Sequence, residues 1–341
     1  MNKVITFGEI MLRLSPPDHK RIFQADNFDV TYGGAEANVA AVLAQLGCES
    51  YFVTALPDNN LGKAAESHLK RFGVGTNYIT KNENARLGIY FLEKGVSQRP
   101  SNVIYDRKYS AISLSKKEDF NWKEIFDNAD WFHFTGITPA LSDNAAKITY
   151  NAAKKAKEKG LKVSCDLNYR GKLWSQEKAK EVMTPLMEFV DVVIGNEEDA
   201  EKIFGIRATD SSVEKGELKK EDYEIVAQKL VSEFELDFAA ITLRESHSAS
   251  INGWSAIIHN GERMLESKKY EIHVVDRVGG GDSFAGGLIF SQINNKPLQD
   301  TLEFAVACSA LKHTVHGDFN VITPKEVSLL QESSGSGRIQ R

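Results

Sequence analysis

The chain has 341 residues, of which 42% are hydrophobic and 26% are charged, a mix typical of globular proteins. This composition excludes a wholly disordered chain, a collagen and a long coiled coil. With 42 Lys and Arg against 47 Asp and Glu, the formal net charge is −5, so the chain has no basic excess to drive binding to nucleic acids. We therefore expect no nucleic-acid partner.

Cysteine usage and hydropathy both favour the cytoplasm. The three cysteines, Cys48, Cys165 and Cys308, are far apart and form no CxxC pair, as is usual in a reducing compartment. The N-terminal segment lacks the apolar core of a signal peptide, and no run of about 18 apolar residues occurs that could span a membrane. We expect a cytoplasmic protein without a membrane partner.

Short apolar segments alternate with helical patterns along most of the chain. The apolar segments predict buried strands over Val4–Phe7, Tyr51–Leu56, Trp131–Thr135, Val163–Asp166, Asp191–Ile194 and Phe238–Leu243. Helices are predicted around Val39–Leu46, which Gly47 ends, and over Asn144–Lys159, Gln176–Phe189 and Tyr223–Phe234. This alternation predicts an α/β fold with a mainly parallel sheet covered by helices on both faces. Ligands of such sheets bind outside the carboxyl ends of the strands.

Two segments break the alternation. Phe23–Tyr32 and Leu87–Tyr105 have the pattern of short antiparallel strands, and we interpret them as a small β-sheet that forms a lid. The expected main domain comprises residues 1–12, 33–86 and 106–330, and the lid comprises residues 13–32 and 87–105. The polar segment Arg207–Glu221 is expected to be a surface excursion, and residues 331–341 a flexible tail.

A run of three glycines, Gly279, Gly280 and Gly281, precedes a predicted helix with Asp282 in its first turn. Glycines allow backbone N–H groups to turn toward an anion, and a helix N-terminus adds partial positive charge. Asp282 is placed to accept a proton from an attacking hydroxyl. The alternative is that Asp282 only caps the helix.

A second glycine-rich segment, with Gly33 and Gly34, opens the first predicted helix, and Asn38 lies one turn further on. One interpretation is that a ligand approaches the backbone of Gly34 closely while Asn38 donates to its hydroxyls. The other is a tight turn before a packed helix.

Together and in this order, the two segments resemble the signatures of the ribokinase-like (PfkB) family of sugar and nucleoside kinases. The family's D-T-x-G-A-G-D-x-F is matched at Asp276, Gly279, Gly281, Asp282 and Phe284, and its GG-x-x-x-N-x-A is matched at residues 33–40. The resemblance covers nearly the whole chain. It implies a ribokinase-like α/β domain with a β lid and ATP-dependent phosphorylation of an alcohol. It also implies that Asp282 is the base and that the preceding glycines form the anion hole.

Within the family the chain is most similar to kinases of 2-keto-3-deoxygluconate, through GIYFLE (88–93), VIYDR (103–107), FHFTGI (132–137) and DLNYRGKLW (166–174). The residues themselves favour an acid. Tyr90, Tyr105 and Arg107 fall in the expected lid, and Arg170 follows a predicted strand. Two arginines suit a carboxylate, which guanidinium binds bidentately, whereas a neutral sugar needs no such pair. The alternative for each arginine is a surface ion pair.

The resemblance also implies residues near the nucleotide. Its D-x-N-x-R motif places Asn168 and Arg170 near the reacting groups, and its N-x-x-E motif, tied to magnesium-bound phosphates through water, falls on Asn196 and Asp199. Asp199 keeps the charge but is one methylene shorter than the family's Glu, so its link to the metal is indirect at most. The family's G-x-x-G after the strand ending at Leu243 is absent. Either Arg244 contacts phosphate directly or this loop takes a different path.

The resulting hypothesis is a kinase that transfers the γ-phosphoryl group of ATP, with Mg²⁺, to the terminal hydroxyl of a 2-keto-3-deoxy sugar acid. The sequence leaves open a monovalent cation near Asp276 and a homo-oligomer formed through the lid strands. One alternative is a kinase for a neutral hexose such as fructose. A nicotinamide-dependent dehydrogenase would need a GxGxxG after the first strand, which is absent. A non-catalytic sugar-acid sensor would not need a base such as Asp282.

Overall fold

A ten-stranded sheet forms the main body of the computed structural model, which describes residues 2–208 and 220–332. Seven strands are parallel, in the spatial order β11 (Phe238–Ser246), β10 (Val192–Gly195), β9 (Lys162–Asp166), β8 (Trp131–Thr135), β1 (Lys3–Phe7), β4 (Glu49–Pro57) and β5 (Ile79–Asn82). Beyond β11 the sheet continues with the antiparallel strand β12 (Ile251–His259), which pairs with β13 (Met264–Glu266) and β14 (Tyr270–His273). The predicted mainly parallel sheet is confirmed. The antiparallel extension and β5 were not predicted.

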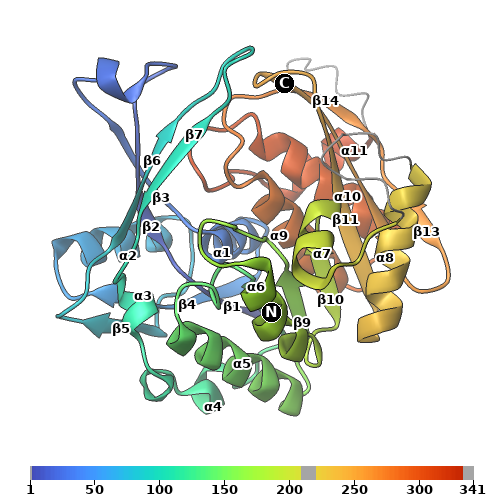
Figure 1. The fold of residues 1–341 in the computed structure, drawn as a ribbon, viewed down its shortest axis with the longest axis horizontal. Helices are drawn as coiled ribbons and strands as arrows, with labels where there is room; N and C mark the ends of the chain where they lie inside the picture. Colours follow the sequence, from blue (N-terminus) through green and yellow to red (C-terminus); the bar gives the residue numbers. More distant parts are fainter. Residues whose placement is uncertain (1, 209–219, 333–341) are drawn as a thin grey trace.

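Helices cover both faces of this sheet (Figure 1). Neighbouring residues of a strand point to opposite faces, and in β1 Val4 belongs to one hydrophobic cluster and Ile5 to another. The cluster of Val4 contains residues of α1 (Ala35–Gln45), α9 (Gly280–Ile293) and α10 (Leu298–Lys312). The cluster of Ile5 contains residues of α3 (Ala111–Leu114), α4 (Trp122–Ile125), α5 (Asp143–Glu158), α6 (Gln176–Met187), α7 (Glu197–Phe204) and α8 (Lys220–Phe234). α2 (Asn60–Arg71) packs beside α1, and α11 (Pro324–Glu332) packs beside α10.

A separate four-stranded sheet stands away from the main body (Figure 1). Its strands lie in the order β3 (Asp29–Gly33), β2 (Met11–Ser15), β6 (Gly88–Glu93) and β7 (Asn102–Asp106), and only β2 and β6 are parallel. The prediction of a strand from Phe23 onward was wrong for its first part, because Ile22–Gln24 forms a 3₁₀ turn and pairing begins at Asp29. β2 ends at Ser15, before two prolines that cannot donate to a strand ladder.

Two predicted segments fall mainly outside the residues that the structure describes. Residues 209–219 contain most of the polar segment Arg207–Glu221, and residues 333–341 contain most of the predicted tail. The part of the chain between them is continuous from α8 to α11 and includes the whole triple-glycine segment.

Candidate active site

A cavity of about 370 Å³ lies where the carboxyl ends of the central strands meet the N-terminal ends of α1 and α9, beneath the small sheet. The residues that the sequence singled out for catalysis and for binding substrate or nucleotide all line it: Gly34, Asn38, Tyr90, Tyr105, Arg107, Asn168, Arg170, Asn196, Asp199, Arg244, Gly279, Gly280, Gly281 and Asp282. The fold thus brings together residues that are up to about 250 positions apart in the chain. Their contacts show what each can do.

Asp282 lies in the first turn of α9, and its carboxylate accepts a hydrogen bond from Asn38. The Asn38 Nδ2 to Asp282 Oδ2 distance is 2.6 Å, and the Asn38 Oδ1 accepts the N–H of Gly34 at 3.3 Å. Burial raises the pKa of Asp282 to about 6, although the hydrogen bond from Asn38 favours the ionised form. The carboxylate is therefore mainly ionised at neutral pH and held at the wall of the cavity, as a general base requires.

The three glycines begin α9, and they differ in what surrounds them. Gly279 has φ +87°, in the left-handed region that glycine favours, and a side chain there would clash with the main-chain oxygen of Asp318. A side chain on Gly281 would meet nothing within 4 Å. The turn therefore packs against the protein at Gly279 and opens at Gly281, next to Asp282, where an anion can approach the helix N-terminus.

Gly34 also needs to be glycine, for a reason that the sequence did not show. A side chain at Gly34 would clash with the main-chain oxygen of Glu9, between β1 and β2. Close packing of two backbones, and not only approach of a ligand, therefore explains this residue. The Asn38 side chain likewise donates to Asp282 and accepts from Gly34, so it holds the Asp282 carboxylate in place.

The aromatic and basic residues of the small sheet are also engaged with protein groups. The buried Tyr90 hydroxyl donates to Asp318, and its ring lies 5.9 Å from that of Tyr105, which is 41% exposed. The Arg107 guanidinium lies 5.3 Å from the ring of Tyr105 and donates to one carboxylate oxygen of Glu9, through Nε at 2.8 Å and through Nη2. Of the five N–H donors of Arg107, these bonds use two.

Two buried carboxylates line the cavity near the ends of β9 and β10. Asp199 accepts from the N–H of Tyr169 at 2.9 Å and forms a reciprocal cap with Asn196, the residue before α7. Asp166 lies at the end of β9, and the structure gives its carboxylate no hydrogen-bond partner among the described residues. Burial raises the pKa of Asp199 to about 6. Burial, together with repulsion from Asp199, raises the pKa of Asp166 well above its ordinary value.

Asn168 and Arg170 lie in the segment that Asp199 holds. Asn168 is buried and adopts φ +40°, an uncommon conformation outside glycine that clusters at functional sites. Arg170 is exposed, and its Nη1 donates to the main-chain oxygen of Tyr169 at 2.9 Å. Its charge opposes the rise in the pKa values of Asp282 and Asp199.

The segment after Leu243 remains part of a strand. β11 continues through Arg244 to Ser246 and pairs with β12, so no loop begins at that point. Arg244 still lines the cavity, as does Arg277, whose Nη2 donates to the main-chain oxygen of Ala249 at 2.9 Å. Burial, together with repulsion from Arg244, lowers the pKa of Arg277.

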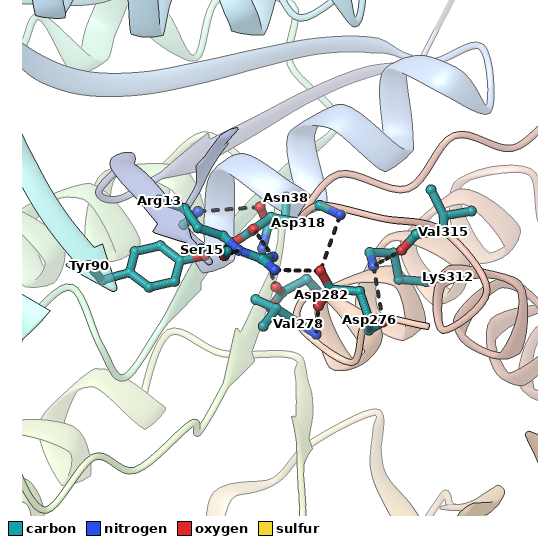
Figure 2. A network of polar contacts seen from close by, with 12 residues as sticks. Arg13, Ser15, Asn38, Tyr90, Asp276, Val278, Asp282, Lys312, Val315 and Asp318 are labelled. Atoms are coloured by element: carbon teal, nitrogen blue, oxygen red, sulfur yellow. Dashed lines mark hydrogen bonds and ion pairs between the residues drawn. The ribbon is translucent and has the colours of Figure 1, made fainter. Parts of the chain in front are cut away.

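Arg13, Asp318 and Lys312 form a buried charge network that the sequence analysis missed (Figure 2). Arg13 bridges Asp276 at 2.5 Å and Asp318 at 2.7 Å. The other contacts of the Asp276 carboxylate are the N–H groups of Val278 and Gly317, each at 3.2 Å. Both of its oxygens therefore already accept hydrogen bonds, and Arg13 places a positive charge beside one of them. A signal for the network exists in the sequence, because Arg13 interrupts an apolar strand.

Glu36 was also missed, although it lies inside the first glycine-rich segment. Its side chain is 1% exposed, and its Oε1 accepts the Thr135 hydroxyl at 2.8 Å, the Thr135 N–H at 3.1 Å and the Thr138 hydroxyl at 2.6 Å. Burial raises the pKa of Glu36 to about 7. Glu36 thus joins the start of α1 to the end of β8 beside the cavity.

Comparison with known proteins identifies the family of the chain. Residues 1–325 match the model of the pfkB family carbohydrate kinases, and the chain belongs to that family. It is therefore a carbohydrate kinase with the ribokinase-like α/β fold, and the dehydrogenase alternative is excluded. Within the part of the chain that the structure describes, the helices are too short or too polar to cross a membrane.

Three relatives show where in the family the chain lies. The crystal structure of 2-dehydro-3-deoxygluconokinase from Thermotoga maritima shares 55% identity over 97% of this chain and 98% of that one, with a TM-score of 0.93. The 2-dehydro-3-deoxygalactonokinase of Haloferax volcanii is 33% identical over 98% of both chains. The 2-dehydro-3-deoxygluconokinase of Bacillus subtilis is 27% identical over 94% of this chain and 93% of its own.

Proposed function

We propose that the protein transfers the γ-phosphoryl group of ATP to the terminal hydroxyl of 2-keto-3-deoxygluconate, also called 2-dehydro-3-deoxygluconate, to give the 6-phosphate. The observation that supports it most is the position of Asp282. Its carboxylate is fixed by Asn38 next to the open glycine Gly281, in a cavity that Arg107 and Arg170 also line. The likeness to the Thermotoga maritima enzyme supports the choice of substrate.

In the proposed reaction, Asp282 orients the terminal hydroxyl and accepts its proton as the oxygen bonds to the γ-phosphorus. The bond from that phosphorus to the β-phosphate oxygen breaks, and ADP leaves. Phosphoryl transfer depends mainly on positioning and on neutralising charge. The N–H groups at the start of α9 face the negative charge of the transferred group, and the small sheet restricts the access of water.

The acid end of the substrate is assigned to Arg107 and Arg170, with Tyr105 beside them. Arg107 retains three N–H donors beyond the two that bind Glu9, and Arg170 is exposed on the wall of the cavity. Guanidinium groups bind carboxylates in a planar, two-bonded geometry. Tyr90 acts less directly than its position in the sequence suggested, because its hydroxyl holds Asp318.

Magnesium fits the carboxylates on the nucleotide side of the cavity. Asp166 lacks a hydrogen-bond partner among the described residues, and its negative charge repels that of Asp199. A cation between these carboxylates and the phosphates would reduce that electrostatic repulsion. Bound Mg²⁺ supplies charge neutralisation for the phosphates of ATP. Asn168, Asn196 and Arg244 complete the proposed nucleotide side.

The test is an ADP-release screen of the purified protein with ATP and Mg²⁺. The acceptors are 2-keto-3-deoxygluconate, its C4 epimer derived from galactonate, aldonic acids, and neutral hexoses including fructose. We expect the highest kcat/KM with 2-keto-3-deoxygluconate. Preference for fructose would replace this proposal with a neutral-hexose kinase, and preference for the epimer would move the assignment to the galactonate series. ATP and acid binding without turnover would identify a sensor.

A further inference from the structure

Lys312 has an unusual environment for a lysine. It is the last residue of α10, and its side chain is fully buried. Its ammonium nitrogen donates to two main-chain oxygens, that of Asp276 at 3.4 Å and that of Val315 at 3.1 Å (Figure 2). Burying an ammonium group costs several kcal/mol unless opposite charge and hydrogen bonds compensate it, so its position calls for an explanation.

The compensation comes from the charge network described above. Asp276 and Asp318 supply two negative charges, and Arg13 and Lys312 supply two positive ones. Arg13 binds the carboxylates directly, whereas Lys312 binds main-chain oxygens on either side of them. The ammonium thus joins two segments, one leading into α9 and one following α10.

The same lysine lies beside the glycine turn. The Cε of Lys312 lies 3.2 Å from the position that a side-chain carbon on Gly279 would occupy. Asp282 lies three positions after Gly279, and the positive charge of Lys312 favours the ionised form of the Asp282 carboxylate. A fixed cation therefore lies directly behind the residues that would face the transferred phosphoryl group.

We propose that the Lys312 ammonium is a built-in cation that positions the Gly279–Gly281 turn, so that phosphoryl transfer needs no monovalent metal ion. This inference rests on the proposed kinase function. It follows from the contacts, because main-chain oxygens and a carboxylate are the ligands that would coordinate a monovalent cation. Here Lys312 occupies the oxygens of Asp276 and Val315, and Arg13 occupies the carboxylate. Lys312 is thus a positioning residue that acts through the turn.

The first test needs only the wild-type protein. Turnover of whichever acceptor the screen identifies is measured with K⁺, Na⁺ or tetramethylammonium as the sole monovalent cation, at constant ionic strength and saturating Mg²⁺. We expect equal kcat values in the three salts. Stimulation by K⁺ or Na⁺ would overturn the proposal. Absence of turnover with every acceptor would contradict the proposed function instead, and the same comparison of salts would then be made on slow ATP hydrolysis.

The second test distinguishes whether the charge of Lys312 is needed or only its side-chain volume. Lys312→Ala leaves space, whereas Lys312→Met fills it without charge. We expect kcat to fall roughly 10²-fold in both, similar to the loss of one oxyanion-hole contact. Added NH₄⁺ or K⁺ should restore activity in Lys312→Ala only, and tetramethylammonium should restore it in neither. Lys325→Ala, at an exposed position on α11, is the control.

Loss of activity without cation rescue in folded Lys312→Ala would show a packing role and overturn the proposal. Urea unfolding of each variant is measured first. If neither variant folds, the comparison of salts in the wild type decides the question.

Discussion

Asn38 and Asp282 lie 244 positions apart in the chain, yet the amide nitrogen of one donates to the carboxylate of the other at 2.6 Å. This bond joins the start of α1 to the start of α9, the two helices that follow the glycine-rich segments. A residue that only capped α9 would have its carboxylate on its own backbone N–H groups. Asp282 instead points to a neighbouring helix across the wall of the cavity, which favours the catalytic interpretation.

The first prediction is that Asp282→Asn abolishes most turnover and leaves binding nearly unchanged. Asn keeps the size of the side chain and can still accept from Asn38, but it cannot take the proton of the substrate. We expect kcat to fall roughly 10²–10⁴-fold, the usual effect of losing a positioned general base. Steady-state kinetics and calorimetric binding of the acid would measure both effects. Near-full turnover of the variant would show that Asp282 is not the base.

The second prediction concerns pH. The ionised form of Asp282 is the active base, and burial raises its pKa to about 6, so kcat should fall as the pH drops through about 6. The hydrogen bond from Asn38 lowers that pKa. Asn38→Ala should therefore move the acid limb of the kcat profile to higher pH and cost more activity at pH 6.5 than at pH 9. Equal loss at both pH values would mean that Asn38 does not tune the base.

Much of this fold could be predicted because buried parallel strands are apolar runs. β1, β8 and β10 were found in that way, and the site followed because the carboxyl ends of such strands share one edge. β12 was not found. It is an antiparallel strand with Asn252, Gly253 and Ser255 among its apolar residues, and their order gives no clear strand signal.

The pairing of charged side chains could not be predicted. Arg107 and Glu9 are 98 positions apart, and Arg13 and Asp318 are 305 apart, so only the folded chain shows that they meet. A buried lysine such as Lys312 looks in the sequence like any lysine at the end of a helix, where positive charge is favoured in any case. The sequence therefore predicted many of the residues that line the site, and the structure was needed to show which groups each of them contacts.

The third prediction is a requirement for a divalent cation that depends on Asp166. Removing that carboxylate should weaken the attraction for Mg²⁺ near the phosphates, so Asp166→Asn should raise the Mg²⁺ concentration for half-maximal activity. Asp199→Asn is the comparison, because Asp199 also holds the N–H groups of Tyr169 and Asn196. We expect its effect to appear mainly in KM for ATP. Full activity of the wild type in excess chelator would contradict the requirement itself.

The fourth prediction is a change in stability with pH at Glu36. Burial raises its pKa to about 7 from an ordinary value of 4.5. The unfolding free energy of the wild type should therefore fall as the pH rises from about 4.5 to 7, because the unfolded chain ionises Glu36 more readily. Glu36→Gln removes this loss and can still accept from Thr135 and Thr138. The difference in unfolding free energy between variant and wild type should therefore grow by up to about 3 kcal/mol from pH 5 to pH 8, at about 1.4 kcal/mol per pKa unit. Urea unfolding at the two pH values measures it, and a constant difference would contradict the prediction.

The fifth prediction is that Arg107 discriminates between an acid and a neutral substrate. A charge-assisted hydrogen bond contributes about 1.5–3 kcal/mol. Arg107→Ala should therefore lower kcat/KM for 2-keto-3-deoxygluconate roughly 10–150-fold, since each 1.4 kcal/mol is about tenfold. Arg107→Lys should recover only part of the lost kcat/KM, because lysine keeps the charge but lacks the planar, two-bonded geometry of guanidinium. Weak phosphorylation of a neutral analogue that lacks the carboxylate should barely change.

The contact with Glu9 must be separated from this effect, because Arg107→Ala also leaves the Glu9 carboxylate buried without its partner. The double variant Glu9→Gln/Arg107→Ala removes that unpaired charge. If Arg107 binds the carboxylate of the substrate, the double variant should still discriminate poorly between the acid and the neutral analogue. This should hold even if the double variant is as stable to unfolding as the wild type. Glu9→Gln alone should keep the preference, because the guanidinium remains. If the double variant regains the preference for the acid, the role of Arg107 is to neutralise Glu9 and hold the small sheet, and recognition of the acid then falls to Arg170.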